Sequence, residues 1–153
     1  MAFDLQLNSE DHSASTNRAG LSIIVLGNDL RGIEIGFWTG DVWAQNFGFT
    51  PGEDAAYNTT QRKTYTLGVS GNNYPLTVGG SVLLSGLLRD YSSSGAPYTT
   101  PNFIFVGDDT FSANASSSFF NASLSAPEPG AIVLTLAGLA LVIGRASRRS
   151  ATR

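Results

Sequence analysis

The sequence predicts an all-β body, an antiparallel β-sandwich, followed by a single C-terminal transmembrane helix. About eight or nine short apolar or alternating runs recur at spacings of about 8–12 residues, a pattern typical of sandwiches. No long helical period precedes residue 126. An uncharged apolar run then occupies residues 131–143. We therefore divide the chain into a β-domain at 1–125 and a tail at 126–153.

The first half of the body contains strand-like runs separated by turn residues. Phe3, Leu5 and Leu7 alternate with polar side chains, which is the pattern of a half-buried strand. Residues 8–20 are polar and without period, so we expect a loop there. The strands expected in this half are 3–7, 21–26, 33–37 and 42–49. The last two are expected to form a hairpin around Thr39-Gly40-Asp41.

The second half repeats this pattern. We expect loops at 50–60 and at 91–101, which are rich in residues that favour turns. Residues 81–88 would also suit a short helix, but their glycines favour a strand. The strands expected in this half are 63–69, 74–78, 81–88, 103–106 and 118–124.

Charge and cysteine content exclude several functions. The body holds five basic and eleven acidic residues, a formal net charge of −6. Because nucleic-acid phosphates would repel an acidic surface, we expect no nucleic-acid partner. The chain has no cysteine, which excludes disulfides, thiolate metal sites and cysteine nucleophiles.

Catalytic motifs are weak. His12 is the only histidine and lies between Asp11 and Ser13. A triad works through convergence in space, whereas neighbours along an extended chain point apart. A single histidine without cysteine also disfavours zinc or copper. Paired carboxylates could serve a glycosidase, but the sequence fixes no separation between them. We therefore predict that the chain is not an enzyme.

Paired acidic residues raise the question of calcium, which takes several oxygen ligands from loops. Asp108 and Asp109, with Asp90 or Asn102, are the first candidate for such a site. Glu53-Asp54 is a second candidate. The alternative is that these acids are solvated in turns, and the sequence favours that alternative.

Trp38 and Trp43 flank the turn of the expected hairpin. An exposed pair of tryptophans could stack on the sugar rings of a matrix polysaccharide. Aromatic side chains also dominate the burial of apolar surface in cores, so one or both could instead be buried. The sequence favours burial and leaves glycan contact as the alternative.

The tail has three parts in fixed order. Pro127, Glu128 and Pro129 form an extended hinge, since each proline fixes its own φ and restricts the preceding residue. Residues 130–144 would form an apolar helix of roughly 22 Å at about 1.5 Å per residue. That is short for a bilayer core of about 30 Å, although snorkelling and thinning accommodate a modest mismatch. A core helix is the alternative, but the run has no polar face.

Arginines follow the apolar run directly. Arg145, Arg148 and Arg149 lie in the basic segment 145–153, which we interpret as a membrane stop. Arginines beside a membrane span stay cytoplasmic, so the body is expected on the exported side of a single-pass protein.

This tail resembles the PEP-CTERM sorting signal of exported proteins in Gram-negative bacteria, many of which produce extracellular polysaccharide. The resemblance covers only about the last 28 residues. It departs from the family at Ala126, where valine is frequent, and at Ala146 and Ser147, which interrupt the arginines. It implies that the inner membrane holds the precursor until an exosortase, a membrane-embedded cysteine protease, cuts near the Pro-Glu-Pro motif. The processed protein would then reach the cell surface or medium.

The sequence as a whole predicts an exported envelope or matrix protein with a structural or adhesive role, involved in biofilm. The alternative is a glycan-binding module of the exopolysaccharide matrix, and a small hydrolase is disfavoured. Export requires a signal peptide, whereas the chain begins with a strand-like segment that carries Asp4. We therefore expect a signal peptide encoded upstream of Met1.

Overall fold

A computed structural model describes residues 1–125, and Met1–Ser123 forms a compact unit within them. This part of the chain contains eleven β-strands and one short 3-10 helix, η1 (Ser92–Ser94). The strands are β1 (Ala2–Asp11), β2 (Ser22–Leu26), β3 (Arg31–Phe37), β4 (Asp41–Gln45), β5 (Pro51–Ala56), β6 (Lys63–Leu67), β7 (Asn73–Val78), β8 (Ser81–Leu87), β9 (Arg89–Asp90), β10 (Ile104–Gly107) and β11 (Asn114–Ser123).

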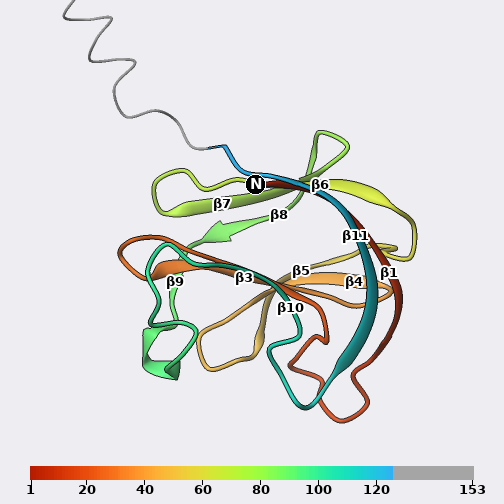
Figure 1. Ribbon diagram of the computed structural model, residues 1–153, viewed down its shortest axis with the longest axis horizontal. Coiled ribbons are helices and arrows are strands. Elements are labelled where there is room, and N and C mark those ends of the chain that lie inside the picture. Colours follow the sequence, from red (N-terminus) through yellow and green to blue (C-terminus); the bar gives the residue numbers. More distant parts are fainter. Residues whose placement is uncertain (126–153) are drawn as a thin grey trace, which may run out of the picture. The chain divides into compact units, whose positions relative to one another are not determined.

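The strands form two antiparallel sheets (Figure 1). The five-stranded sheet has the order β11-β1-β6-β7-β8. The six-stranded sheet has the order β10-β2-β3-β4-β5, with β9 paired to β3. The expected all-β, antiparallel architecture is confirmed, and the two sheets share one hydrophobic core, as in a β-sandwich.

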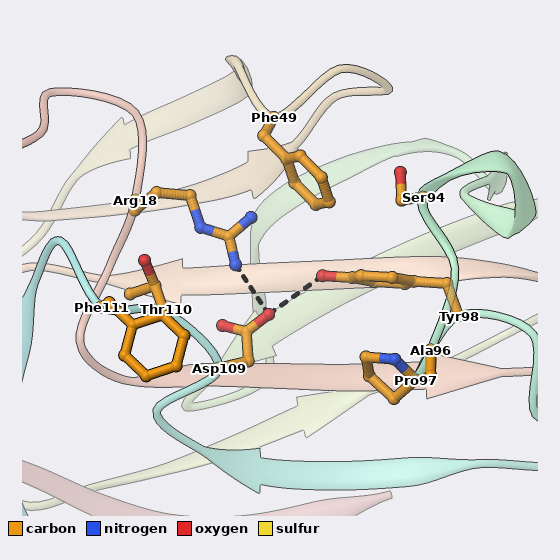
Figure 2. Close-up of a pocket in the computed structure, with 9 residues that line it drawn as sticks. All are labelled: Arg18, Phe49, Ser94, Ala96, Pro97, Tyr98, Asp109, Thr110 and Phe111. Atoms are coloured by element: carbon orange, nitrogen blue, oxygen red, sulfur yellow. Dashed lines mark hydrogen bonds and ion pairs between the residues drawn. The ribbon is translucent and has the colours of Figure 1, made fainter.

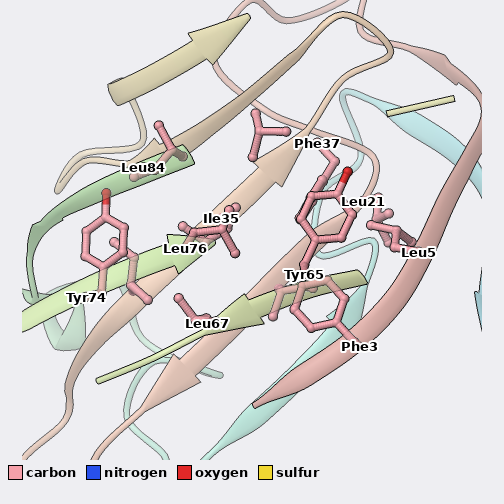
Figure 3. Packing of buried hydrophobic residues seen from close by; sticks show 14 of the residues in the cluster. Phe3, Leu5, Leu21, Ile35, Phe37, Tyr65, Leu67, Tyr74, Leu76 and Leu84 are labelled. Carbon is pink, nitrogen blue, oxygen red and sulfur yellow. The ribbon is translucent and has the colours of Figure 1, made fainter. Parts of the chain in front are cut away.

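That core is built by the alternation of side chains along the strands. Phe3 on β1 packs in parallel with Tyr65 on β6, with 5.4 Å between ring centroids, and both lie edge-on to Phe37 on β3. Ile33 and Ile35 contribute from the opposite sheet (Figure 3 labels Ile35). Each large apolar side chain removed from water contributes about 1.5–3 kcal/mol, so this face holds the two sheets together.

The six-stranded sheet is also buried on its other face, which points away from the five-stranded sheet. On β2, Ile24 and Leu26 form a second apolar cluster with Tyr91 and Tyr98 from the 91–103 segment. On β3, Gly36 leaves room for the indole of Trp43, which a Cβ at Gly36 would approach to 2.8 Å. The predicted loop 91–101 therefore covers the sheet in part, rather than lying wholly on the surface.

The predicted strands at 3–7, 21–26, 33–37, 63–69, 74–78 and 103–106 are confirmed in position, as is the hairpin of β3 and β4. Residues 81–87 form β8, which settles the choice between helix and strand. The predicted loop at 50–60 is wrong, because it contains β5. β5 is the last strand of its sheet, and an edge strand tolerates a proline such as Pro51.

The ends of the chain's first and last strands also differ from expectation. β1 continues to Asp11 inside the predicted loop 8–20, where it pairs with Asn114 of β11. The strands expected at 103–106 and 118–124 belong to different sheets, since β10 pairs with β2 and β11 with β1. Asp108 and Asp109 consequently lie on the segment that connects β10 in one sheet to β11 in the other.

The features predicted for the tail lie outside the described residues. They are the hinge 127–129, the apolar helix 130–144 and the basic segment 145–153. No helix within residues 1–125 has the length and apolar character needed to cross a bilayer.

Candidate functional site

The candidate site begins with an acidic residue on the covered face of β3. Glu34 alternates with Ile33 and Ile35, so its side chain leaves the sheet on the face opposite the core. The residue is only 1% exposed. Its Oε1 accepts a hydrogen bond of 3.2 Å from the Ser22 hydroxyl, and Tyr98 Oη lies 2.5 Å from its Oε2. A buried carboxyl group is stable only with such partners, and here both oxygens have one.

Arg18 brings a cation to this carboxyl group. Its Nη2 lies 3.7 Å from Glu34 Oε1 and donates a 2.7 Å hydrogen bond to Asp109 Oδ2. Its guanidinium packs on the Phe49 ring, 4.4 Å from the centroid. The Trp38 indole N–H donates to the Arg18 carbonyl oxygen at 3.2 Å, which fixes the backbone of the connecting segment. Arg18 is thus held from three sides, with its side chain 13% exposed.

The Tyr98 hydroxyl lies between the two acids, 2.5 Å from Glu34 Oε2 and 3.0 Å from Asp109 Oδ2. A hydroxyl group has one proton and can donate it to only one of them. Burial, reinforced by the charge of Asp109, raises the pKa of Glu34 to about 7. Below that pH, protonated Glu34 can donate to Tyr98 Oη, which leaves the Tyr98 proton for Asp109 Oδ2. Glu34 Oε2, the Tyr98 hydroxyl and Asp109 Oδ2 then each have a partner.

A second tyrosine, Tyr91, bonds to the backbone of this network. The Tyr91 hydroxyl donates to the Gln45 carbonyl oxygen at 2.5 Å and accepts from the Glu34 backbone N–H at 3.4 Å. Burial raises the pKa of Tyr91, so its hydroxyl remains protonated and available as a donor.

A pocket of about 340 Å³ opens above this network (Figure 2). This volume lies in the range of small-molecule sites, about 300–1,000 Å³. Phe49 lines it with a left-handed backbone conformation, φ 58°, which is uncommon for a bulky residue. Phe111 is fully exposed at its edge. The main lining residues are Arg18, Phe49, Pro97, Tyr98, Asp109 and Phe111.

Asp109 contributes an unusual group to the pocket lining. Its side chain is 7% exposed, and its Oδ2 accepts from Arg18 and Tyr98. Its Oδ1 is buried and has no hydrogen-bond partner. In Figure 2 this oxygen points away from Tyr98, toward the side of Thr110 and Phe111. An unpaired buried acceptor costs about 1–3 kcal/mol, so a donor placed there would be favourable.

The predicted calcium ligands Asp108 and Asp109 each bond to other groups of the chain. Asp108 Oδ1 accepts the Thr110 backbone N–H at 2.9 Å, and Asp109 is engaged by Arg18. Glu53 of the second candidate pair forms an ion pair with Arg89. Within residues 1–125, no group of three or more His, Cys, Asp or Glu residues could hold a metal ion. Calcium binding at Asp108 and Asp109 stays a prediction.

The two tryptophans differ in exposure. Trp43 is 1% exposed and lies against Gly36, so its ring is buried, as the favoured interpretation predicts. Trp38 is partly exposed and stacks on His12, with 4.2 Å between ring centroids. His12 Nδ1 pairs with Glu10 Oε2 at 2.5 Å and not with its neighbour Asp11.

Sequence reasoning missed Arg18, Glu34, Tyr98 and Phe49 as parts of one site. They come from four separate segments, and only the fold brings them together. One signal was present on β3, where Gly32, Glu34 and Gly36 occupy successive positions of one face. Two glycines beside an acid on a strand indicate that other chain segments pack closely against that face.

No protein-family model matches this chain, and comparisons with curated proteins and with solved structures find no match either.

Proposed function

We propose that this chain is an exported envelope or extracellular-matrix protein of a Gram-negative bacterium with a structural or adhesive role. The inner membrane holds it by its tail, and an exosortase processes it. One observation carries the proposal: Pro127-Glu128-Pro129, an uncharged apolar run and an arginine cluster follow one another in that order.

Each part of the tail has a physical role in this proposal. The two prolines keep Glu128 in an extended segment, which a protease can bind without first unfolding a helix. An arginine at the bilayer centre costs about 2.5–3.5 kcal/mol, so the basic segment 145–153 resists translocation. The precursor therefore stays in the membrane with its body outside until it is cut.

The described body is compatible with this arrangement. Its last strand, β11, ends at Ser123, shortly before the hinge at 127–129. The body also carries eleven acidic and five basic residues, whereas the tail carries four arginines and one acid. This asymmetry favours an exported body and a cytoplasmic basic segment.

The test is the mass of the protein recovered from the envelope and medium of a Gram-negative host with an active exosortase. We expect the mature form to lack residues 131–153. Replacing Pro127, Glu128 and Pro129 with alanine should leave insertion intact and abolish processing. Deleting residues 145–153 should instead weaken retention and disturb orientation.

A matched control is the alanine replacement of Thr99, Thr100 and Pro101, three exposed residues of the body that also include a proline. This variant should be processed as the wild type is. A mature protein that still carries residues 131–153 would contradict the proposal.

A further inference from the structure

We propose that the pocket lined by Arg18, Tyr98, Asp109 and Phe111 binds a neutral saccharide residue. The inference goes beyond the sorting function and does not depend on it, because every residue concerned lies in the body. Of these residues, the sequence alone singled out only Asp109, as a candidate calcium ligand.

The hydrogen-bonding groups of the pocket suit the hydroxyl groups of a sugar. Asp109 Oδ1 is a buried acceptor without a partner, on a side chain that is 7% exposed. Beside it, Arg18 uses Nη2 for Asp109 Oδ2 and retains further N–H donors on the same guanidinium. A hydroxyl group both donates and accepts, so a pair of neighbouring hydroxyls can donate to Oδ1 and accept from Arg18. Sugars carry such pairs of hydroxyls.

The pocket also has an apolar part. Phe111 is fully exposed at the edge, and Phe49 and Tyr98 present rings on the other side (Figure 2). A single exposed aromatic residue is ordinary, but this one stands beside an unpaired buried carboxylate oxygen. A pyranose ring combines hydroxyls at its edge with an apolar C–H face, and an aromatic ring can pack against that face.

The charges around the pocket select a neutral ligand. The positive charge of Arg18 is already offset by Asp109, 2.7 Å away, and Glu34 adds either no charge or a negative one. The body around the pocket carries a formal net charge of −6. A uronate or a phosphorylated sugar would therefore meet no free cation and a repulsive field.

The pocket is organised before any ligand arrives. The Trp38 indole holds the Arg18 backbone, Tyr98 holds Asp109, and a left-handed backbone at Phe49 directs its ring onto the guanidinium. A site whose polar groups are already fixed loses less entropy on binding. Glu34, which is 1% exposed with both oxygens paired, supports these groups from beneath and does not face the pocket.

The experiment is native electrophoresis of the full chain, kept in a detergent without a sugar headgroup, through gels that contain a soluble polysaccharide. The neutral polymers are dextran, galactomannan, xylan and hydroxyethyl cellulose, and alginate is the anionic comparison. We expect at least one neutral polymer to retard the protein, and alginate not to do so. Titration with oligosaccharides of the retarding polymer then gives the affinity.

Phe111→Ala is the main variant, because an exposed ring can be removed without disturbing the fold. We expect about tenfold weaker binding, which is the size of one aromatic contact of about 1.4 kcal/mol. Phe120→Ala is the matched control, since Phe120 is an exposed phenylalanine on β11 of the other sheet. It should bind as the wild type does. Asp109→Asn, checked for folding by near-ultraviolet circular dichroism, should also weaken binding because Oδ1 and the negative charge are altered.

Retardation by none of the four neutral polymers would overturn the proposal. Stronger retardation by alginate than by any neutral polymer would overturn it as well. Equal binding by Phe111→Ala and wild type would place the sugar elsewhere on the molecule. None of these outcomes bears on processing of the tail, so the failure of this inference and of the proposed function are distinguishable.

Discussion

The six-stranded sheet has one face that packs against the five-stranded sheet and another that is covered by connecting segments. The first face is apolar throughout, with Ile33, Ile35 and Phe37 projecting from β3. The second carries Glu34 between two glycines and meets Arg18 from one segment and Tyr98 from another. The apolar face binds the sheets together, whereas the polar face positions groups that can recognise a ligand.

This difference has a consequence for stability. Apolar contacts on the inner face are non-directional and add up with buried area. The outer face depends on hydrogen bonds that must all be made at once, since an unpaired buried group costs more than a formed bond contributes. Substitutions on the two faces should therefore differ in how much they lower the free energy of unfolding. They should also differ in how that loss depends on pH and on a second substitution.

The largest effect is expected on the inner face. Phe3 is 1% exposed and packs against Tyr65, Phe37 and Phe119. Phe3→Ala should lower the free energy of unfolding by about 3–5 kcal/mol, because it leaves a cavity between the sheets. Urea unfolding at two pH values measures this, and the loss should be the same at both. A loss that changed with pH would contradict the separation of the two faces.

On the outer face, Arg18→Met should lower the free energy of unfolding by a smaller amount, up to about 3 kcal/mol, because the Asp109 carboxylate would lose its cation. The double variant Arg18→Met with Asp109→Leu removes both charges and should recover most of that loss. Unfolding of both single variants and the double variant gives the coupling between them. Additive losses would show that the ion pair does not hold this face.

The pH dependence of the free energy of unfolding should distinguish the outer face from the inner face. The pKa of Glu34 is raised from 4.5 to about 7, so the folded state holds this proton more tightly than the unfolded chain. Its contribution to stability is fully present below about pH 4.5 and is lost as the pH rises to about 7, an effect of roughly 3 kcal/mol.

Glu34→Gln imitates the protonated side chain and should remove this decline between pH 5 and pH 7. His12→Gln is the control, because His12 pairs with Glu10 and lies outside the network; it should retain the decline. Unfolding by urea across this range is the measurement. An undiminished decline in Glu34→Gln would mean that another group is responsible.

The smallest loss is expected for Tyr98→Phe, which should lower the free energy of unfolding by about 1–2 kcal/mol. The variant removes only the hydroxyl that joins Glu34 to Asp109, while Arg18 still pairs with Asp109. Tyr57→Phe is a suitable control, because the Tyr57 ring packs against Tyr65 and its hydroxyl takes no part in the network. Equal stability of the two variants would contradict the bridging role of the Tyr98 hydroxyl.

The inner face could be predicted from the sequence, because Phe3, Leu5 and Leu7 alternate with polar residues within one short segment. The same local signal located β2, β3, β6, β7 and β8. β5 was missed because Pro51-Gly52-Glu53-Asp54 has the composition of a loop, and only pairing with β4 makes it a strand. Edge strands depend on a partner more than on their own residues.

The outer face could not be predicted, because its residues are distant in sequence and converge only through the fold. Tyr98 and Asp109 lie on segments that look like solvated loops, and Glu34 is 64 residues from Tyr98 along the chain. Asp109 was recognised as a candidate ligand for a metal, but its pairing with Arg18 has no local signature. The glycines beside Glu34 indicate close packing without identifying what packs there.

The most direct test of this account is the titration of the Glu34 carboxyl group itself. A protein labelled with ¹³C at glutamate carboxyl carbons gives one resonance for each glutamate, and comparison with Glu34→Gln assigns the one for Glu34. The account predicts a midpoint near pH 7, with proton donation from Glu34 to Tyr98 and from Tyr98 to Asp109 below it. A midpoint near 4.5 would mean that Glu34 is ionised at neutral pH and that this order of donors is wrong.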